Sequence, residues 1–431
     1  MKIKIVDKSY SEVMALPIPK HRNPKKIGLF FRTLIKVLSA LNLKRNDMSY
    51  REHGMERLAK KEPCLILMNH SSFIDLQIAA DYLYPRPFST VCTTDAYVGK
   101  TWLMRQIGCI PTQKFVSDIT LLKDIKYALH TLKSSVLMYP EAGYSFDGTA
   151  TTLPDSLGGL LKILKVPVIT IISRGAFSRE PLYNMLRHRK VSISADVTYL
   201  LSPEDIEKST PDELNGIIKE AFSFDNFRWQ QENNIIINEA FRADGLERVL
   251  YKCPHCLAEG TTEGKGTRLV CKSCNSAYEL TELGALERTG GEPLFTHIPN
   301  WFSWQRDEVR KELFDGSYRL DTDVDIYMMV DYSAVYRVGE GRLTHDCDGF
   351  RLVGCNGELE YTQSPLSSYS ICADYFWYEI GDMICIGNKR HLFYCFPKNS
   401  KTIVAKTRMA AEELFLIKMN EKRLRRQKVN E

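Results

Sequence analysis

The chain has 431 residues, of which 44% are hydrophobic and 26% are charged, and its formal net charge is +5. This length suits two or three domains of roughly 100–200 residues each, and the composition excludes general disorder. The mild positive charge does not by itself indicate nucleic-acid binding, but it suits a protein that approaches an anionic membrane. No apolar run of about 18 residues occurs, so we expect no transmembrane helix. Residues 1–10 lack the apolar core of a secretory signal, which predicts a cytoplasmic protein whose cysteines stay reduced unless they bind a metal.

Residues 1–45 are interpreted as an N-terminal arm followed by a basic amphipathic helix. Prolines interrupt the arm up to Pro24, and apolar residues then recur at helical spacing, with Arg32 and Lys36 among the cations between them. Such a helix can lie in the lipid interface, with its apolar face down and its cations among the headgroups. The apolar stripe could equally pack on the rest of the domain. Its members are Ile27, Phe30, Phe31, Leu34, Ile35, Leu38 and Leu41.

Residues 46–250 alternate between short apolar runs and helical stretches. The helical stretches include Leu121–Leu132 and Ser156–Leu164. Alternation of this kind predicts an α/β domain with a largely buried sheet. The apolar runs expected to form its strands are Cys64–Met68, Phe88–Cys92, Ser135–Tyr139, Val166–Ser173 and Val191–Tyr199.

The second half of the chain has a different pattern. Residues 251–282 form a short insert rich in cysteine, and 283–320 are expected to be a linker with a short helix near Trp304–Leu313. Residues 321–431 then predict a β-rich domain that ends in a helix. This strand pattern suits a pleckstrin-homology or lipid-binding barrel type, or equally a β-sandwich. The expected strands are Ile326–Val330, Ala334–Val338, Phe350–Val353, Tyr375–Ile380, Met383–Gly387 and His391–Phe396.

Four cysteines of the insert have the spacing of a zinc site. The two C-x₂-C knuckles are separated by fourteen residues, which resembles a zinc ribbon. Four thiolates so placed form a tetrahedral Zn²⁺ site that folds a segment too short to have its own core. We expect the zinc to be structural, because protein thiolates fill all four positions. The predicted ligands are Cys253, Cys256, Cys271 and Cys274.

The first segment with a catalytic pattern follows the predicted strand that ends at Met68. The chain turns at Asn69-His70, and Ser71 or Ser72 is expected to cap the next helix. If His70 lies in the turn and Asp75 in the first turn of the helix, their side chains can meet. The carboxylate then accepts the imidazole N–H and raises the basicity of the other ring nitrogen. Such a pair can take a proton from an alcohol that attacks a thioester, although a structural histidine at a helix start is the commoner arrangement.

Three further segments add to this pattern in chain order. Gly108 and Pro111 fix a bend before Lys114, which could face a phosphate or be an ordinary surface lysine. A predicted strand ends in Pro140-Glu141-Ala142-Gly143, which places a carboxylate and free backbone N–H groups at the sheet edge where α/β proteins bind ligands. An ordinary β-turn with a solvated glutamate fits the same residues. The fourth segment, Val166-Pro167-Val168, has little meaning alone.

Together, these segments resemble the glycerolipid acyltransferase family, whose bacterial members make phosphatidic acid from lysophosphatidic acid. The resemblance covers about residues 25–225 and rests on the N-H-x-x-x-x-D, G-x-I-P, P-E-G and V-P-V blocks. It implies that His70 is the general base and that Asp75 orients it. It also implies that Asn69, Lys114, Glu141 and Gly143 help to bind the acceptor.

The chain departs from the family pattern at two places. Where the family has Gly-Thr-Arg after the glutamate, this chain has Ala142-Gly143-Tyr144, so the arginine expected to bind phosphate is missing. Thr93-Thr94-Asp95 stands where many members have a lysine. Both differences bear on the acceptor's phosphate and leave acyl transfer unaffected.

We therefore expect a membrane-surface acyltransferase. It moves a fatty acyl group from acyl-CoA or acyl-carrier protein to a lipid hydroxyl, with lysophosphatidic acid as the favoured acceptor, and it is peripheral on the inner face of the cell membrane. The alternative is a zinc-ribbon interaction or nucleic-acid-binding protein on a non-catalytic α/β scaffold. Nucleic-acid binding requires a basic, aromatic face around the ribbon. Here Lys252, Lys265, Arg268 and Lys272 are balanced by Glu259, Glu263, Glu279 and Glu282, so no nucleic-acid partner is expected.

Overall fold

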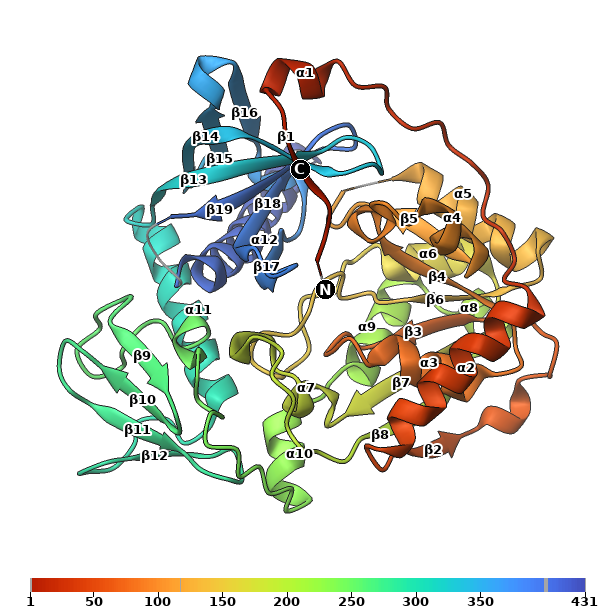
Figure 1. The fold of residues 1–431 in the computed structure, drawn as a ribbon, viewed down its shortest axis with the longest axis horizontal. Helices are drawn as coiled ribbons and strands as arrows, with labels where there is room; N and C mark the ends of the chain where they lie inside the picture. Colours follow the sequence, from red (N-terminus) through yellow and green to blue (C-terminus); the bar gives the residue numbers. More distant parts are fainter. Residues whose placement is uncertain (1, 117, 399–401, 431) are drawn as a thin grey trace.

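The computed structural model describes residues 2–116, 118–398 and 402–430, and it contains three separate β-sheets. An α/β domain lies on the right of Figure 1, a small four-stranded ribbon at the lower left, and a β domain above it. The long helix α11 (Ile298–Asp315) connects the ribbon to the β domain. Met1 and Glu431, the ends of the predicted segments 1–45 and 321–431, lie outside the described residues.

The α/β domain is built on a seven-stranded sheet in the order β2-β8-β7-β3-β6-β4-β5. All neighbouring pairs are parallel except β7 with β8. The carboxyl ends of β3, β4, β5, β6 and β7 therefore meet at one edge, where α/β folds bind ligands. The strands are β2 (Ser49–His53), β3 (Leu65–Met68), β4 (Phe88–Thr93), β5 (Cys109–Thr112), β6 (Ser135–Met138), β7 (Val168–Arg174) and β8 (Ser194–Leu201).

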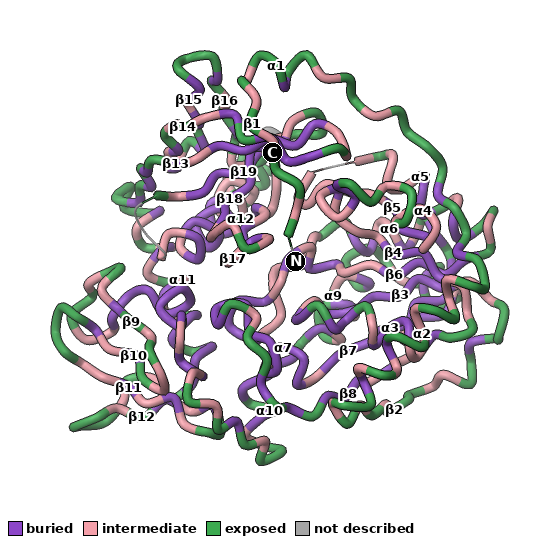
Figure 2. Tube along the Cα trace, in the orientation of Figure 1, coloured by how far each residue is buried: buried purple, intermediate pink, exposed green. Residues whose placement is uncertain are grey.

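Both faces of this sheet are covered by helices, as a largely buried parallel sheet requires. Successive residues of β3 enter opposite cores: Ile66 and Met68 pack on one side, and Leu65 and Leu67 on the other. Figure 2 shows β3 and β6 as buried segments in the middle of the domain. Helices α2 (Leu29–Lys44) and α3 (Asp75–Leu83) pack against each other beside the first core, and α6 (Leu157–Leu164) and α9 (Pro211–Ala221) cover the second.

The predicted strands of this domain are confirmed, with shifts of a few residues at their ends. Two differences are larger. The run expected to begin at Val191 becomes a strand at Ser194, although its first residues are buried. The helix expected over 121–132 divides into α5 (Ile119–Lys126) and a π-helical turn, Tyr127–Thr131.

Helix α2 confirms the predicted amphipathic helix, but its contacts differ from those expected of a lipid-facing helix. Leu43 is buried, and Ile35 packs against the core. Arg32 donates to the Pro85 carbonyl, and Lys36 forms an ion pair with Asp81 at 2.6 Å. The expectation that these two cations face headgroups is therefore wrong, because both bind the domain. A second apolar face remains exposed, made of Leu29, Phe30, Leu34, Val37, Leu38 and Leu41.

The N-terminal arm connects the two large domains. Strand β1 (Ile5–Asp7) pairs in parallel with β14 of the β domain. After α1 (Tyr10–Met14), the chain passes down the outside of the α/β domain to α2 as an extended, mostly exposed segment (Figures 1 and 2). The first strand of the chain thus belongs to the sheet of the C-terminal β domain, and the α/β domain follows it in the sequence.

The cysteine-bearing insert folds as an antiparallel sheet in the order β12-β11-β10-β9. Its strands are β9 (Thr262–Lys265), β10 (Arg268–Cys271), β11 (Ala277–Leu280) and β12 (Leu286–Arg288), so the sheet extends beyond the predicted end at 282. The ribbon lies against α11, where Trp301 Nε1 donates to the Lys252 carbonyl at 2.9 Å. Helix α11 is longer than the short helix expected near 304–313 because Gly316, in a left-handed conformation, ends it only after Asp315.

The β domain is one antiparallel sheet in the order β16-β15-β14-β13-β19-β18-β17, with β1 added beside β14. One continuous sheet excludes the predicted β-sandwich. Helix α12 (Ile403–Asn430) packs Val404, Met409 and Ala410 into the same core as the sheet. The strands are β13 (Leu320–Met329), β14 (Val335–Asp346), β15 (Gly349–Gly354), β16 (Leu359–Gln363), β17 (Cys372–Trp377), β18 (Gly381–Gly387) and β19 (Leu392–Pro397).

One predicted strand of this domain is wrong in part. The run Tyr375–Ile380 was expected to be extended, but β17 ends at Trp377. Tyr378 and Glu379 have φ values of 46° and 67°, which turn the chain into a tight connection to β18. Their aromatic and apolar neighbours made the turn look like a strand, although two consecutive left-handed residues turn the chain away from the strand direction.

Candidate active site

The predicted catalytic pair forms where β3 passes into α3. His70 lies in the turn after the strand, and Asp75 is the first residue of the helix. His70 Nδ1 and Asp75 Oδ2 are 3.2 Å apart. The spacing of five residues thus brings the two side chains together, as expected for one residue in a turn and the other at a helix start.

The Asp75 carboxylate is buried and held by several donors. Oδ2 accepts from the backbone N–H groups of Ser71 at 2.8 Å and Ser72 at 3.0 Å, and Oδ1 accepts from Ser173 Oγ at 3.3 Å. The expectation that Ser71 or Ser72 caps α3 is wrong, because Asp75 accepts from their backbone and the N-cap position is Ile74.

The imidazole of His70 is enclosed on both faces. The Tyr139 ring stacks on it with centroids 4.2 Å apart, and the Tyr144 ring with centroids 4.1 Å apart. Burial lowers the pKa of His70 below its ordinary value of 6.5, against the opposing effect of Asp75. With Nδ1 directed at the carboxylate, Nε2 is the nitrogen left to accept a proton. The described residues make no hydrogen bond to Nε2.

Asn69 lies beside the pair but is not directed at a ligand. It is completely buried, its Oδ1 accepts from Ser173 N at 2.8 Å, and its Nδ2 donates to Ser173 O at 3.0 Å. These bonds fasten the end of β3 to the end of β7. Asn69 therefore holds the turn that carries His70, and its implied binding of the acceptor stays a prediction.

Glu141 is held by backbone groups in a similar way. It is fully buried, Oε2 accepts from His70 N at 2.8 Å, and Oε1 accepts from Thr151 N at 2.8 Å. Burial raises the pKa of this carboxyl to about 7, against the effect of the two N–H donors. Both oxygens accept from backbone groups, so Glu141 holds the His70 turn, and its implied part in binding the acceptor stays a prediction.

Three comparisons with known proteins bear on this arrangement. Residues 49–174 match the family model described as Acyltransferase. The segment is an acyltransferase domain. The chain is also similar to the 1-acyl-sn-glycerophosphate (LPA) acyltransferase PlsC from Thermotoga maritima, with 14% identity over 45% of this chain and 77% of that chain and a TM-score of 0.35. No curated protein matched.

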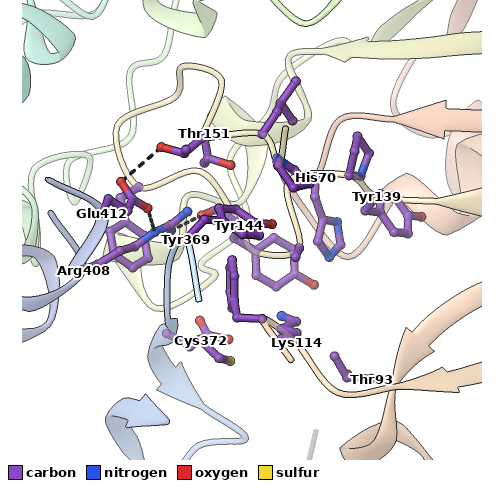
Figure 3. A pocket seen from close by; sticks show the side chains of 18 of the residues that line it. His70, Thr93, Lys114, Tyr139, Tyr144, Thr151, Tyr369, Cys372, Arg408 and Glu412 are labelled. Carbon is purple, nitrogen blue, oxygen red and sulfur yellow. Dashed lines mark hydrogen bonds and ion pairs between the residues drawn. The ribbon is translucent and has the colours of Figure 1, made fainter. Parts of the chain in front are cut away.

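The acyltransferase domain and the β domain share a cavity of about 2320 Å³ beside His70. The acyltransferase domain lines it with His70, Lys114 and Tyr144, and the β domain lines it with Asp374 and Arg408, among others. Figure 3 shows Lys114, Tyr369, Cys372 and Arg408 around the space beside His70 and Tyr144. The active site is thus bounded by two domains.

Lys114 lies in this cavity, as the sequence pattern suggested for a phosphate ligand. Its Nζ is 5.8 Å from the centre of the Tyr144 ring. Burial opposes its charge, but the nearby Cys372, Asp374 and Asp95 leave the pKa of Lys114 above its ordinary value. Among the described residues it has no ion pair within 4.0 Å, so its ammonium group remains available to a ligand.

Gly143 is buried against a residue that sequence reasoning missed. A methyl group added at Gly143 would lie 3.7 Å from Nη2 of Arg408. Arg408 Nη1 donates to the Tyr144 carbonyl at 3.0 Å. The guanidinium of α12 therefore rests on the loop that encloses His70. No local pattern around residue 408 indicates this contact, and the two tyrosines that stack on His70 were also missed.

The four predicted zinc ligands are brought together in the ribbon. Their Sγ atoms all lie within 4.8 Å of one another, and the Cys253–Cys274 and Cys256–Cys271 pairs are both 3.7 Å apart. Sulfurs bound to one tetrahedral Zn²⁺ at about 2.3 Å are about 3.8 Å apart. The cluster therefore has the geometry of a metal site. It lies outside the residues that line the cavity at His70.

No helix in the described part of the chain is both long enough and apolar enough to span a bilayer. Apolar side chains nevertheless gather on the outside of the acyltransferase domain. Trp102 and Leu103 of α4 (Thr101–Gln106) are exposed, and the Trp102 ring is 6.2 Å from that of Phe31 on α2. The exposed face of α2 and these two residues of α4 form what we call the apolar face.

Proposed function

We propose that this protein transfers a fatty acyl group from a thioester, acyl-CoA or acyl-carrier protein, to a hydroxyl of a lipid. The observation that carries the proposal is the His70–Asp75 pair at 3.2 Å, with a free ring nitrogen beside a large cavity. The match to the acyltransferase family supports the reaction class. The favoured acceptor is lysophosphatidic acid, as the sequence resemblance implies.

In the proposed step, Nε2 of His70 takes the proton of the acceptor hydroxyl as its oxygen attacks the thioester carbonyl. The new C–O bond gives a tetrahedral intermediate, which collapses with cleavage of the C–S bond. The thiolate leaves and takes the proton back from the imidazolium, so the histidine ends in its starting state. Asp75 stabilises the imidazolium meanwhile, because its buried carboxylate accepts from Nδ1.

The cavity is large enough for an acyl chain and an acceptor together. Ligand pockets for small molecules usually measure about 300–1,000 Å³, and this one is larger. Its wall includes apolar side chains from both domains, which suits a hydrocarbon chain. They include Leu76, Met104, Leu121, Leu153, Phe415 and Met419.

We further infer that the enzyme meets its lipid acceptor at the membrane surface through the apolar face. Phe30 is 72% exposed and Trp102 is 67% exposed, and both belong to helices of the α/β domain that carries His70. Large exposed apolar patches mark membrane or protein contacts, and aromatic side chains favour the bilayer interface. The inner face of the cell membrane is the proposed location.

A structural Zn²⁺ is the proposed cofactor, bound by Cys253, Cys256, Cys271 and Cys274. It supplies no chemistry to acyl transfer, because the protein thiolates fill the coordination sphere. Its role is to hold the two knuckles of the ribbon together.

The test is acyl transfer by the His70→Ala variant. Purified protein is incubated with acyl-CoA and a panel of lysolipids, and products are identified by mass spectrometry. Loss of the base should lower kcat by about 10²–10⁴, and a thermal melt of the same preparation checks that the variant is folded. His53→Ala, an exposed histidine on β2, is the matched control and should retain activity. Near-normal turnover by folded His70→Ala protein would falsify the assignment.

A further inference from the structure

The loop over residues 140–145 contacts a buried guanidinium from the far end of the chain. Arg408, on α12 of the β domain, is only 6% exposed. Its Nη1 donates to the Tyr144 carbonyl at 3.0 Å, and Nη2 lies over Gly143. Tyr144 is also the residue that stacks on His70. The β domain therefore places a cation in contact with Tyr144, the residue whose ring stacks on that of His70.

A network on α12 and α11 fixes the position of Arg408. Its Nε donates to Glu412 Oε1 at 3.1 Å, and the same oxygen accepts from Ser370 Oγ at 2.7 Å. Arg306 binds the other Glu412 oxygen at 2.7 Å. Because one side of the guanidinium is anchored in this way, its orientation toward the cavity is set before any ligand arrives.

Arg408 retains donor capacity on the cavity side. Nε and Nη1 account for its hydrogen bonds with the described residues, and Nη2 makes none. Lys114 lines the same cavity, with its Nζ near the Tyr144 ring. Two cations from different domains thus flank one tyrosine that touches His70 (Figure 3).

We propose that Arg408 and Lys114 together form an interdomain site for a phosphate group on the acyl acceptor. The proposal rests on the proposed function and specifies its acceptor: a lysolipid with a phosphate close to the reacting hydroxyl. A guanidinium binds phosphate through a planar fork of N–H donors, and an ammonium group adds a point charge. The arginine missing from the loop after Glu141 is thus supplied by another domain.

The carboxylates around the site are compatible with this ligand. Glu412 already pairs with Arg408, and Asp95 and Asp374 flank Lys114. Burial raises the pKa of Asp374 to about 7, so a large share of this group is protonated near neutral pH and can donate a hydrogen bond.

Proximity to His70 favours the acceptor over the donor as the source of the phosphate. In a lysophosphatidate, the hydroxyl and the phosphate stand on one glycerol unit. In acyl-CoA, the whole pantetheine arm separates the thioester from the phosphates. The cations contact or approach Tyr144, whose ring is 4.1 Å from that of His70, so a phosphate bound there lies near the reacting oxygen.

Direct binding tests the site without requiring turnover. Calorimetry on the full-length protein, without donor, compares 1-decanoylglycerol 3-phosphate with 1-decanoylglycerol. We expect the phosphate to tighten binding in the wild type. Lys114→Met and Arg408→Gln should each weaken binding of the phosphorylated probe by about tenfold to hundredfold, as expected for a charge-assisted hydrogen bond. Binding of the neutral probe should stay within about twofold.

Lys114→Met is the deciding variant, because Lys114 has no hydrogen bond or ion pair whose loss would disturb the fold among the described residues. Arg423→Gln, exposed on the same helix as Arg408, is the matched control and should bind like the wild type. Equal affinity of the wild type for the two probes overturns the proposal, as does unchanged binding by Lys114→Met. These results are read from binding alone, so they remain informative even if no acyl transfer is found.

Steady-state kinetics separate the two sources of phosphate. If the acceptor supplies it, Lys114→Met raises KM for the phosphorylated acceptor and leaves KM for acyl-CoA unchanged. A raised KM for acyl-CoA with an unchanged acceptor KM would place the donor's phosphates at these residues and overturn the proposal. A wild type that acylates neutral acceptors but binds no phosphate would leave the proposed acyl transfer intact and reject this site.

Discussion

The chemistry that we propose for this protein involves a few atoms around one histidine. Asp75 Oδ2 accepts from two backbone N–H groups and from His70 Nδ1, so one buried oxygen holds both the turn and the ring. Glu141, which follows β6, accepts from His70 N. Asn69, which follows β3, accepts from Ser173 N at the end of β7. Residues predicted to bind substrate thus also hold the turn that carries the proposed base. Lys114 and Arg408 are two of the cations that line the cavity.

The pH dependence of acyl transfer follows from His70. Burial lowers the pKa of His70 below 6.5, and the base works only when neutral. Activity should therefore be complete at neutral pH and fall as the pH drops through a value below 6.5. Because Asp75 raises this pKa, Asp75→Asn should move the acid limb of kcat/KM to still lower pH and reduce kcat by about 10²–10⁴. An acid limb above pH 6.5, or one that Asp75→Asn does not move, contradicts the assignment.

At the scale of elements, α2 has one side that packs on the domain and another that is exposed. Leu43 and Ile35 pack against the domain, while Arg32 and Lys36 bind Pro85 and Asp81. The remaining face carries apolar side chains into solvent, next to Trp102. The core-face interpretation of the amphipathic stripe therefore holds for one side of the helix, and membrane contact through the other side stays a proposal.

The exposed side of α2 can be removed without touching the core. The triple variant Phe30→Ser, Leu34→Ser and Leu38→Ser should lose binding to anionic vesicles in flotation assays while keeping the wild-type melting temperature. Leu43→Ala is the contrasting variant: this side chain is buried, so its loss should destabilise the protein by about 2–5 kcal/mol. If the triple variant unfolds, or still floats with the vesicles, the apolar face is not the membrane contact.

At the scale of the whole molecule, the active site depends on contacts between domains. The ribbon contacts α11 through Lys252, which forms ion pairs with Glu308 and Glu312 of that helix. Helix α11 in turn holds α12 through Arg306 and Glu412, and α12 carries Arg408 to the His70 loop. The β domain thus forms one wall of the catalytic cavity.

The ribbon should contain one zinc ion per chain. Elemental analysis of freshly purified protein should find about one zinc, and Cys271→Ser with Cys274→Ser should reduce this below about 0.2. The same double variant should lower the melting temperature, because the two knuckles lose their shared ligand. A pair of ordinary buried cysteines, Cys385→Ser and Cys395→Ser, controls for thiol loss and should keep the zinc. Purified wild-type protein with four free thiols and no metal would refute the site.

The sequence by itself determined those features that arise within a few neighbouring residues. Apolar periodicity located five of the seven strands of the α/β sheet, because burial on both faces leaves continuous apolar runs. Strands β2 and β5 were not predicted. The five-residue interval from His70 to Asp75 anticipated their contact, since a turn and a helix start can bring them together. The spacing of the two C-x₂-C knuckles likewise predicted that the four cysteine sulfurs lie close together.

The set of side chains that line the cavity depends on the tertiary structure. Tyr144 and Arg408 are 264 positions apart, and no periodicity or motif near either residue records their contact. The contacts by which Asn69 and Glu141 hold the His70 turn were not predicted, because their partners lie on other segments, at Ser173 and Thr151. Local patterns report whether a residue is buried or turns the chain. Which groups meet across domains depends on the packing of whole elements.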